Sequence, residues 1–575
     1  MTSLKDRRIS RRALLAGSGA AAAGLGAAAL VGCGDDDDDE APAPAATQAA
    51  ATEAAATEAA ATEAAATEAA ATEAAATEAA ATEAAATEAP AEGGPQMGGT
   101  LRGSAPTFIW NTGFPFSFTW ENEPYFSVLE PLVRYRDSLD PFPVLAERFE
   151  YNDDRSKLTV TLKPDLEFHD GSPVTPEDVF HGIEVMLDPE PWGIAGRFQI
   201  SSFAVTLTRW EAIDSRTMEF EFDKPRPNMT DFFAQLLVTK KDTYRELQEG
   251  VNIQGTGPFA FEQWTPDVGA SFVANRGWHQ SAVEGGPYLD RIELQNFPDT
   301  ESLGLALEAG DIDWSLGVSP TVARRTGQGF LAPKAGIVYV GCVTTSPKLV
   351  DPRVRQALLY AIDRRRMTEE LREGFGDLTA QPWPSSSPAF DPDLESELYE
   401  PDRARALLAE AGWSQDSPLM IEPIPGTEVT AEILKSNFAD IGVEVEIVTQ
   451  EIGVWVGKLR QRGFVDLWVA PHKFSNLSPL TTMQQTFPYR LGNPSYYETE
   501  TYLDIIANLE RLDPLGEEAK EQYARFNRMW LEDPWLLPVH TNQRIEVANA
   551  NVKGYDEHFV TIFEQPNLAK VWLEG

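Results

Sequence analysis

The sequence predicts a mixed α/β protein whose main domain is large enough for two lobes. Segments in which apolar and polar residues alternate, typical of strands, follow one another along the chain with apolar residues at helical spacing. The stretch 97–575 is longer than a single hydrophobic core usually serves. It contains one cysteine, Cys342, so an ordinary apolar core must hold it together without an internal disulfide.

Four segments have strand patterns. Three alternate apolar and polar residues and predict strands with one buried face: residues 158–162, 218–222 and 443–447. The fourth, 337–343, is apolar throughout and predicts a buried strand. We therefore expect Cys342, which lies in it, to be a core thiol and not a nucleophile.

Three segments predict helices with recognisable ends. Thr175-Pro176-Glu177-Asp178 resembles a capping box with proline at the first helical position. A second helix begins at Asp351-Pro352, and its apolar stripe runs from Val354 to Ile362. A third covers 404–411 and ends near Gly412, a residue suited to a left-handed stop.

The first 33 residues predict an export signal. Arginines precede an uncharged Ala/Gly/Leu run that is about 20 residues long and too poor in large apolar residues for a good membrane helix. The stretch 10–15 resembles a twin-arginine signal, and Leu30-Val31-Gly32-Cys33 resembles a lipobox, in which the cysteine is acylated. We expect a lipoprotein anchored at Cys33. The alternative is a soluble protein whose first 33 residues are a disordered tail.

Residues 34–96 predict a spacer. An acidic run at 35–40 is followed by the repeat Ala-Thr-Glu-Ala-Ala, whose eight glutamates lie every five residues from Glu53 to Glu88. A period of five residues gives no apolar stripe, and the segment has no lysine to pair with the glutamates. We expect this segment to be disordered or loosely helical.

The net charge and the absence of catalytic motifs exclude several classes of function. Of the formal net charge of −42, the main domain 97–575 carries −31, which argues against nucleic-acid binding and against a basic membrane-binding face. The six histidines are scattered, and no serine-hydrolase, zinc-protease or phosphate-loop motif occurs. We therefore expect no enzyme, no cofactor and no metal site.

Five local sequences occur in a specific order. They are Phe168-His169-Asp170-Gly171-Ser172-Pro173-Val174-Thr175-Pro176-Glu177-Asp178-Val179, Gly255-Thr256-Gly257-Pro258-Phe259, Ala309-Gly310-Asp311-Ile312-Asp313, the stretch 351–364 and the stretch 404–413. In content, order and spacing the series resembles the family 5 extracellular solute-binding proteins, the peptide/nickel receptors of ABC importers. The resemblance covers roughly residues 97–575.

The resemblance implies a two-lobed periplasmic-binding-protein-like fold of class II type with an extra inserted subdomain. Lobe I would comprise 97–318, with the subdomain at about 132–240, and would be completed by 536–575. Lobe II would be 319–535. The lobes would close around a ligand at a hinge.

The implied function is a tethered receptor on the extracytoplasmic face of the cell membrane. It would capture a small peptide-like or oligosaccharide-like solute and deliver it to the permease subunits of an ABC importer. We expect a monomer that binds no nucleic acid. The alternatives are a surface-anchored binding or adhesive protein, or an enzyme on the same tether.

Candidate ligand-binding residues are aromatic and polar side chains near the expected cleft, since small-molecule sites combine apolar walls with a few polar groups. They are Trp110, Asn111, Thr344, Thr345, Trp383, Trp468, His472 and Lys473. The competing interpretation is that most of the 14 tryptophans belong to the core.

The segment 467–497 contains no Asp or Glu. Asp466-Leu467-Trp468 matches the strand after which peptide-binding relatives place an acid for the peptide's amino group, and here His472 and Lys473 follow instead. An ammonium buried without a carboxylate is costly, so we expect a ligand that is neutral or anionic at this loop. The alternative is that the loop lies outside the cleft and another acid meets the amine.

Overall fold

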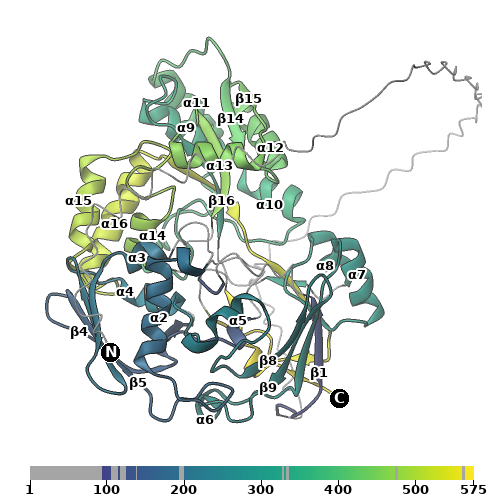
Figure 1. Ribbon diagram of the computed structural model, residues 1–575. Coiled ribbons are helices and arrows are strands. Elements are labelled where there is room, and N and C mark those ends of the chain that lie inside the picture. Colours follow the sequence, from purple (N-terminus) through teal and green to yellow (C-terminus); the bar gives the residue numbers. More distant parts are fainter. Residues whose placement is uncertain are drawn as a thin grey trace, which may run out of the picture. The chain divides into compact units, whose positions relative to one another are not determined.

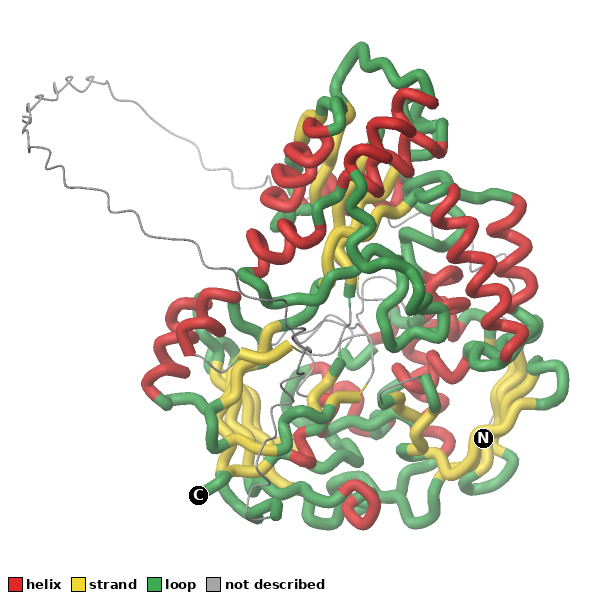
Figure 2. Tube along the Cα trace, turned by 180° about the vertical axis from the view of Figure 1, so that it is seen from behind, coloured by secondary structure: helices red, strands yellow, loops and turns green. Residues whose placement is uncertain are grey.

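The predicted α/β class is confirmed by two large sheets and the helices around them (Figures 1 and 2). The computed structural model describes residues 94–104, 114–116, 125–136, 139–192, 200–326, 329–331, 336–472, 477–559 and 564–575. All belong to one unit, residues 89–575. The predicted signal 1–33 with Cys33, and nearly all of the spacer 34–96, lie outside the described residues.

The first large sheet has seven strands. They are β1 (Thr100–Ser104), β8 (Phe259–Thr265), β9 (Gly269–Ala274), β10 (Arg291–Gln295), β11 (Trp314–Ser315), β12 (Gly329–Leu331) and β18 (Ile545–Ala548). Their order is β12-β18-β11-β1-β10-β9-β8, and β1 is parallel to both β10 and β11. Gly103 lies against Trp314, and a Cβ at Gly103 would be 2.3 Å from the indole ring, so the close packing of β1 on β11 requires glycine.

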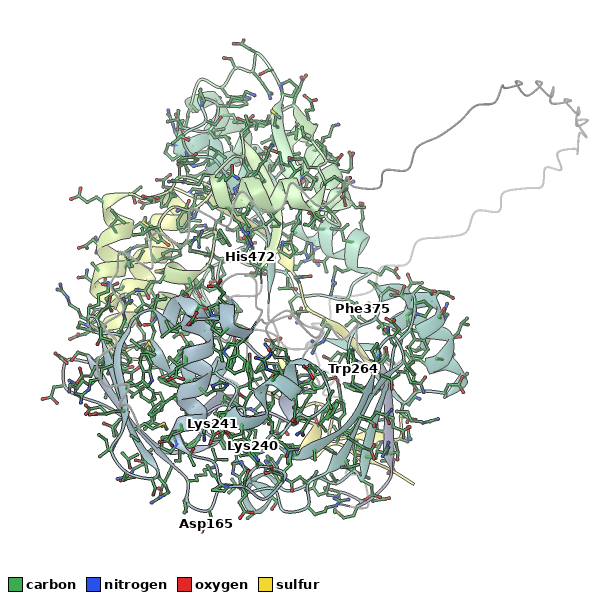
Figure 3. The ribbon with its side chains drawn as sticks, viewed as in Figure 1. Asp165, Lys240, Lys241, Trp264, Phe375 and His472 are labelled. Atoms are coloured by element: carbon green, nitrogen blue, oxygen red, sulfur yellow. The ribbon has the colours of Figure 1, made fainter. Side chains whose placement is uncertain are left out.

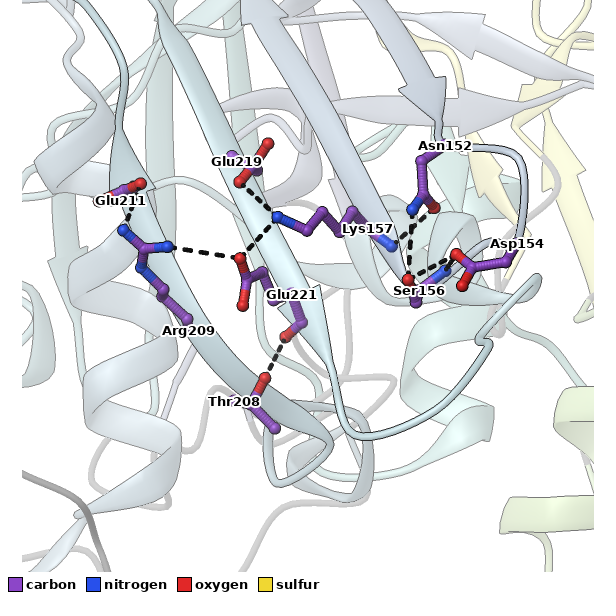
Figure 4. Close-up of polar contacts among 9 residues, drawn as sticks. All are labelled: Asn152, Asp154, Ser156, Lys157, Thr208, Arg209, Glu211, Glu219 and Glu221. Atoms are coloured by element: carbon purple, nitrogen blue, oxygen red, sulfur yellow. Dashed lines mark hydrogen bonds and ion pairs between the residues drawn. The ribbon is translucent and has the colours of Figure 1, made fainter.

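A four-stranded antiparallel sheet has the order β4-β5-β7-β6. Its strands are β4 (Ala146–Tyr151), β5 (Lys157–Leu162), β6 (Leu207–Ala212) and β7 (Thr217–Phe222), so the strands predicted at 158–162 and 218–222 are confirmed. On the polar face, Lys157 Nζ lies 3.2 Å from Glu219 Oε1 and 2.7 Å from Glu221 Oε1 (Figure 4). The remaining pairs are β2 (Val133–Tyr135) with β3 (Pro141–Pro143), β19 (Val552–Lys553) with β22 (Trp572–Leu573), and β20 (His558–Phe559) with β21 (Gln565–Pro566).

Short helices accompany these sheets. They are α2 (Pro176–Leu187), α3 (Ser201–Ala204), α4 (Met229–Gln235), α5 (Tyr244–Gln248), α6 (Ser281–Glu284), α7 (Thr300–Ala309) and α8 (Pro320–Thr326). The predicted capping box at the start of α2 is confirmed, because Thr175 N donates to Asp178 Oδ2 at 3.0 Å.

The second large sheet has five strands in the order β15-β14-β16-β13-β17. They are β13 (Ile337–Cys342), β14 (Leu419–Pro423), β15 (Val445–Ile447), β16 (Leu467–His472) and β17 (Leu536–Thr541). The predicted buried strand is β13, and burial raises the pKa of the Cys342 thiol to about 12, as expected of a core thiol. The strand predicted at 443–447 begins two residues later, at Val445.

Eight helices, counted over the described residues, surround the second sheet. They are α9 (Pro352–Ala361), α10 (Arg364–Arg372), α11 (Pro401–Glu410), α12 (Glu428–Asp440), α13 (Ile452–Gln461), α14 (Pro479–Gln485), α15 (Glu500–Leu509) and α16 (Glu517–Glu532). Two predicted helices are confirmed as α9 and α11. Asp351 caps α9 by accepting from Arg353 N at 2.9 Å, and Gly412 follows α11 with a φ of +66°.

The buried side chains of the described residues form two large clusters, which define two bodies. The first core body is built on the seven-stranded and four-stranded sheets. The second core body is built on the five-stranded sheet and α9 to α16. A small third cluster fills the space between α7, α8 and the seven-stranded sheet.

The chain passes from one core body to the other at two places, and the predicted lobe limits, 318/319 and 535/536, stay a prediction. α8 and β12 accompany the seven-stranded sheet, and β17 pairs with β13. The changes fall between Leu331 and Ile337 and between Thr541 and Ile545. A strand pattern shows that a strand exists but not which sheet it joins, because its partners are distant in sequence.

Candidate functional site

The two segments that connect the core bodies are in contact at Gly336 and Asn542. One runs from the end of β12 to the start of β13, and the other from the end of β17 to the start of β18. Asn542 N, in the second, donates to Gly336 O, in the first, at 2.8 Å. We call these two connecting segments the crossings. Because both are short and in contact, small backbone rotations within them can turn one body against the other.

Three strands of the second core body end at these crossings. Ile337 of β13 is paired with His472 of β16 on one side and with Thr541 of β17 on the other. Figure 3 shows His472 at the end of β16, above the first core body. The side chains at these three strand ends, which we call the sheet edge, are therefore the part of the second body closest to the crossings.

A pocket of about 280 Å³ opens at the same edge. Its wall includes apolar side chains, among them Trp383 and Phe390, and polar ones, among them Asp377 and Gln381. Thr541 Oγ1 accepts from Asp377 N at 3.0 Å and donates to Asp377 O at 2.9 Å, which fixes this loop to the end of β17. An apolar wall with a few fixed polar groups suits a small organic molecule.

The two histidines at this edge are neutral at physiological pH. Desolvation lowers the pKa of His472 to about 3, and its ring stacks on Tyr339 with centroids 5.4 Å apart. Desolvation lowers the pKa of His540 to about 4, despite the 2.9 Å hydrogen bond between its Nδ1 and Thr541 O. The edge therefore offers hydrogen-bonding groups without a histidine cation.

The tryptophans predicted for the site have clear packing roles. Trp383 lines the pocket, but it is only 1% exposed, and its Nε1 donates to Asn527 Oδ1 at 2.9 Å. Trp468 is completely buried beside Phe464, with an interplanar angle of 10°. A Cβ at Gly341 would be 2.0 Å from the Trp468 ring, so the core is fitted around this indole. Ligand contact by either tryptophan stays a prediction.

The other predicted residues are distributed differently. Thr344 and Thr345 follow β13 at the end opposite to Ile337, and Thr344 Oγ1 donates to Ser495 O at 2.8 Å, so they are not brought together with His472. Trp110, Asn111 and Lys473 lie outside the described residues.

Sequence reasoning did not select Asp377, Gln381, Thr541 or His540. The segment around Gln381 carried a signal, since Gln381-Pro382-Trp383-Pro384 is too rich in proline for a helix or central strand. Thr541 and His540 gave none, because they continue an ordinary strand pattern.

The acid-free segment 467–497 receives a carboxylate from elsewhere. It comprises β16, α14 and the loop after α14, and Ser478 in front of α14 hydrogen-bonds to Asp231 of the first core body. Absence of acids in a segment therefore does not imply absence of a carboxylate around it. A neutral or anionic ligand is therefore expected only at the positions next to His472.

Two absences, of a metal site and of a membrane-spanning helix, hold for the described residues. No group of three or more His, Cys, Asp or Glu side chains there is arranged to hold a metal ion. Within the same part of the chain, no helix has both the length and the apolar character needed to cross a bilayer.

Known proteins match most of the main domain. The family model described as bacterial extracellular solute-binding proteins, family 5 middle, matches residues 140–490, more than half of the chain. Heme-binding protein A of Haemophilus influenzae is 27% identical over 358 residues, which span 56% of this chain and 65% of that protein, slightly less than two thirds. The glutathione-binding protein GsiB of Shigella flexneri serotype 5b is 22% identical over 436 residues, 72% of this chain and 83% of that protein.

A solved structure has the same fold. The ABC transporter-associated periplasmic binding protein DppA of Helicobacter pylori, in complex with the peptide STSA, superposes with a TM-score of 0.67. The match covers 84% of this chain and 99% of that one at 18% identity. This likeness supports the two-lobed fold expected from the sequence.

Proposed function

Because the chain belongs to the family 5 bacterial extracellular solute-binding proteins, we propose that it captures a small solute between its two core bodies and delivers it to an ABC importer. The observation that carries the capture site is the sheet edge where β13, β16 and β17 end beside both crossings and the 280 Å³ pocket. A ligand held there touches one body permanently and the other only when the bodies close.

The proposed lobes follow the core bodies. Lobe I is the first core body, with the four-stranded sheet as its inserted subdomain, and lobe II is the second core body. This assignment keeps the predicted arrangement and moves the limits of lobe II to the two crossings. Labels placed on the two bodies should approach each other when a ligand binds, and a chain that never closes with any bound ligand would contradict the proposal.

The proposed ligand is neutral or anionic where it meets His472. A neutral histidine with Tyr339 stacked on it supplies no carboxylate for an ammonium group, and Lys473 follows in the sequence. An oligosaccharide-like solute, a carboxylate-bearing solute or a peptide held without an amino-terminal ion pair fits the positions next to His472, while Asp377 is an acid elsewhere in the pocket wall. The two curated relatives are named for heme and for glutathione, so the family alone does not fix the ligand.

Mass spectrometry of solutes that co-purify with the native protein tests the ligand class. We expect a neutral or anionic compound whose binding weakens in Lys473→Ala. Recovery of ordinary peptides with free amino groups, bound equally well by Lys473→Ala, would contradict this ligand class.

The proposed location is the outer face of the cell membrane, through an acylated Cys33 and export by the twin-arginine route. The support is the sequence alone: the arginine pair, the uncharged run and Leu30-Val31-Gly32-Cys33. Cys33→Ser should move the protein from the membrane fraction to the soluble one, whereas replacing Arg11 and Arg12 by lysine should block export. A Cys33→Ser protein that stays in the membrane fraction would refute the anchor.

We further propose that the receptor acts as a monomer and catalyses no reaction. The alternative of an enzyme on the same tether predicts chemical change in a bound solute. Recovering the solute unaltered after prolonged incubation distinguishes the two.

A further inference from the structure

Asp231 of α4 is a carboxylate of the first core body whose main donors belong to the second. Its Oδ2 accepts from Ser478 N at 3.1 Å, from Ser478 Oγ at 2.7 Å and from Thr481 Oγ1. Its Oδ1 accepts from Tyr135 of its own body at 3.0 Å. Asp231 is 1% exposed, and Ser478 and Thr481 are also buried, so water does not weaken these bonds.

A second side chain of the first body joins the same group. Asn228, directly before α4, donates through Nδ2 to Thr481 Oγ1 at 2.7 Å and to Gln484 Oε1 at 3.2 Å. Asn228, Asp231, Ser478 and Thr481 form what we call the Asp231 cluster. It links α4 to the start of α14 through buried polar contacts.

The cluster lies away from the crossings. Figure 1 shows α14 beside α3 and α4 at the left, whereas α8 and α10 lie at the right, where Arg324 Nε of α8 is 3.0 Å from Glu373 Oε2. A rotation about the crossings would therefore leave the Arg324 side nearly in place and would pull α4 away from α14. The cluster is at the part of the interface where opening displaces atoms most.

Apolar packing does not replace these contacts in the described structure. The buried side chains of the two bodies form separate clusters, and a cavity of about 400 Å³ lies next to Asp231. Tyr135, Asp231 and Ser478 line this cavity together with Leu515 of the second body. Where a void separates the bodies, their attraction depends on the polar groups that bridge it.

We propose that the Asp231 cluster is a latch that holds the two core bodies closed, with Asp231 as the positioning residue that sets how firmly a captured solute is retained. Opening replaces four buried hydrogen bonds to a carboxylate and a threonine by bonds to water. A contact made in the closed state alone raises the apparent ligand affinity by the factor by which it favours closure. This inference rests on the proposed function for its role in capture, but the latch itself is a property of the unliganded chain.

Spin labels on the full-length unliganded chain test the latch. Ile213→Cys in the first body and Val454→Cys in the second provide exposed label positions. Cys33→Ser removes one of the two cysteines of the sequence, and the other, Cys342, is buried. Distances are measured by pulsed electron resonance with and without Asp231→Asn. The amide keeps the size of the side chain but places an NH₂ group among the donors of Ser478 and Thr481. We expect the ratio of short to long distances to fall about tenfold, the scale of one buried charged hydrogen bond.

Asp466→Asn is the matched control. Asp466 is equally buried and accepts from Ser346 Oγ at 2.6 Å and Met420 N at 3.0 Å, but these partners belong to its own body. We expect its variant to unfold more easily and to leave the label distances unchanged. Equal distance shifts in Asp231→Asn and Asp466→Asn would overturn the latch.

Ser478→Ala is the second test variant, and it tests the latch by itself if Asp231→Asn does not fold. It removes a donor to Asp231 from the second body, so it should also shift the label distances. Where both fold, the double variant should shift them no further than Asp231→Asn does, because the two changes remove one shared interaction. Unchanged distances in Ser478→Ala, or fully additive shifts in the double variant, would overturn the proposal. Failure to recover any solute would count against the proposed function and leave these label results intact.

Discussion

Glu130 and Asp231 are both carboxylates of the first core body and both are almost completely buried, but their partners come from different places. Asp231 is held mainly by Ser478 and Thr481 of the second body. Glu130 is held within its own body, by Trp278 Nε1 at 3.1 Å, Thr256 Oγ1 at 2.9 Å and His279 Nε2 at 2.8 Å. Glu130 is bonded within one body, whereas Asp231 joins the two core bodies.

The electrostatic surroundings of Glu130 and Asp231 also differ. Burial acts to raise the pKa of Glu130, but the interaction with His279, the positive charge of Arg134 and the hydrogen bond from Thr256 outweigh it, so the pKa is lowered. Burial also raises the pKa of Asp231, and there hydroxyl and amide donors offset the effect only in part, so the pKa stays raised. Glu130 has the cationic neighbour Arg134, whereas Asp231 has neutral donors, which water replaces at lower cost.

The largest effect is expected when Glu130 loses its charge. In Glu130→Gln the buried Arg134 keeps its positive charge without the neighbouring carboxylate, and Thr256, in the turn between Gly255 and Gly257, loses an acceptor. We expect the free energy of unfolding to fall by about 3–5 kcal/mol. Urea unfolding of the variant and of the partly exposed control Glu221→Gln measures this, and similar midpoints for the two would show that Glu130 is not an anchor.

The next largest effect is expected from His540, a buried histidine without a carboxylate partner among the described residues, on the pH dependence of stability. The pKa of His540 is about 4 in the folded chain, against an ordinary value of about 6.5. Below pH 6.5 the unfolded chain binds a proton that the folded chain does not, so stability is lost as the pH falls from 6.5 toward 4. The slope is about 1.4 kcal/mol per pH unit.

His540→Gln isolates this contribution from that of other groups. The variant should be less stable than the parent at pH 7 and should lose this part of the slope, so that the two stability curves converge toward pH 4. Parallel curves for the parent and His540→Gln would refute the lowered pKa.

Asp231→Asn should have a smaller effect on unfolding than Glu130→Gln, because no buried cation is left behind. The loss of hydrogen bonds to a carboxylate predicts a decrease of about 1–3 kcal/mol in the free energy of unfolding. Urea unfolding measured beside that of Glu130→Gln ranks the two. A larger loss for Asp231→Asn would mean that the interface, and not the body, determines the stability of the chain.

The sequence predicted local structure well wherever one segment carried the whole signal. The capping box at Thr175 and the buried strand around Cys342 depend on neighbouring residues and were found. Pairing across the fold depends on residues hundreds of positions apart, and Asp231 with Ser478 is such a pair. No local pattern distinguishes that aspartate from a solvent-exposed one.

The same limit applies to the candidate site. Tryptophans were chosen because aromatic residues often line ligand sites, but Trp468 has an entire core fitted around it. The edge formed by His472 and Thr541 became visible only when three strands ended together. The sequence of a segment predicts where its own strand ends. It does not show which other strands end beside it.

The smallest effect is expected for the ion pairs on the four-stranded sheet, where Lys157 lies between Glu219 and Glu221 (Figure 4). The shorter of these pairs measures 2.7 Å, but the Lys157 side chain is 42% exposed, so water and salt screen its charge. Holding the long side chain in one conformation also costs entropy. We expect Lys157→Met to leave the urea midpoint unchanged within error in 0.15 M salt. A midpoint shift as large as that of Asp231→Asn would show that the number of charged contacts, and not their burial, decides how strongly these carboxylates stabilise the chain.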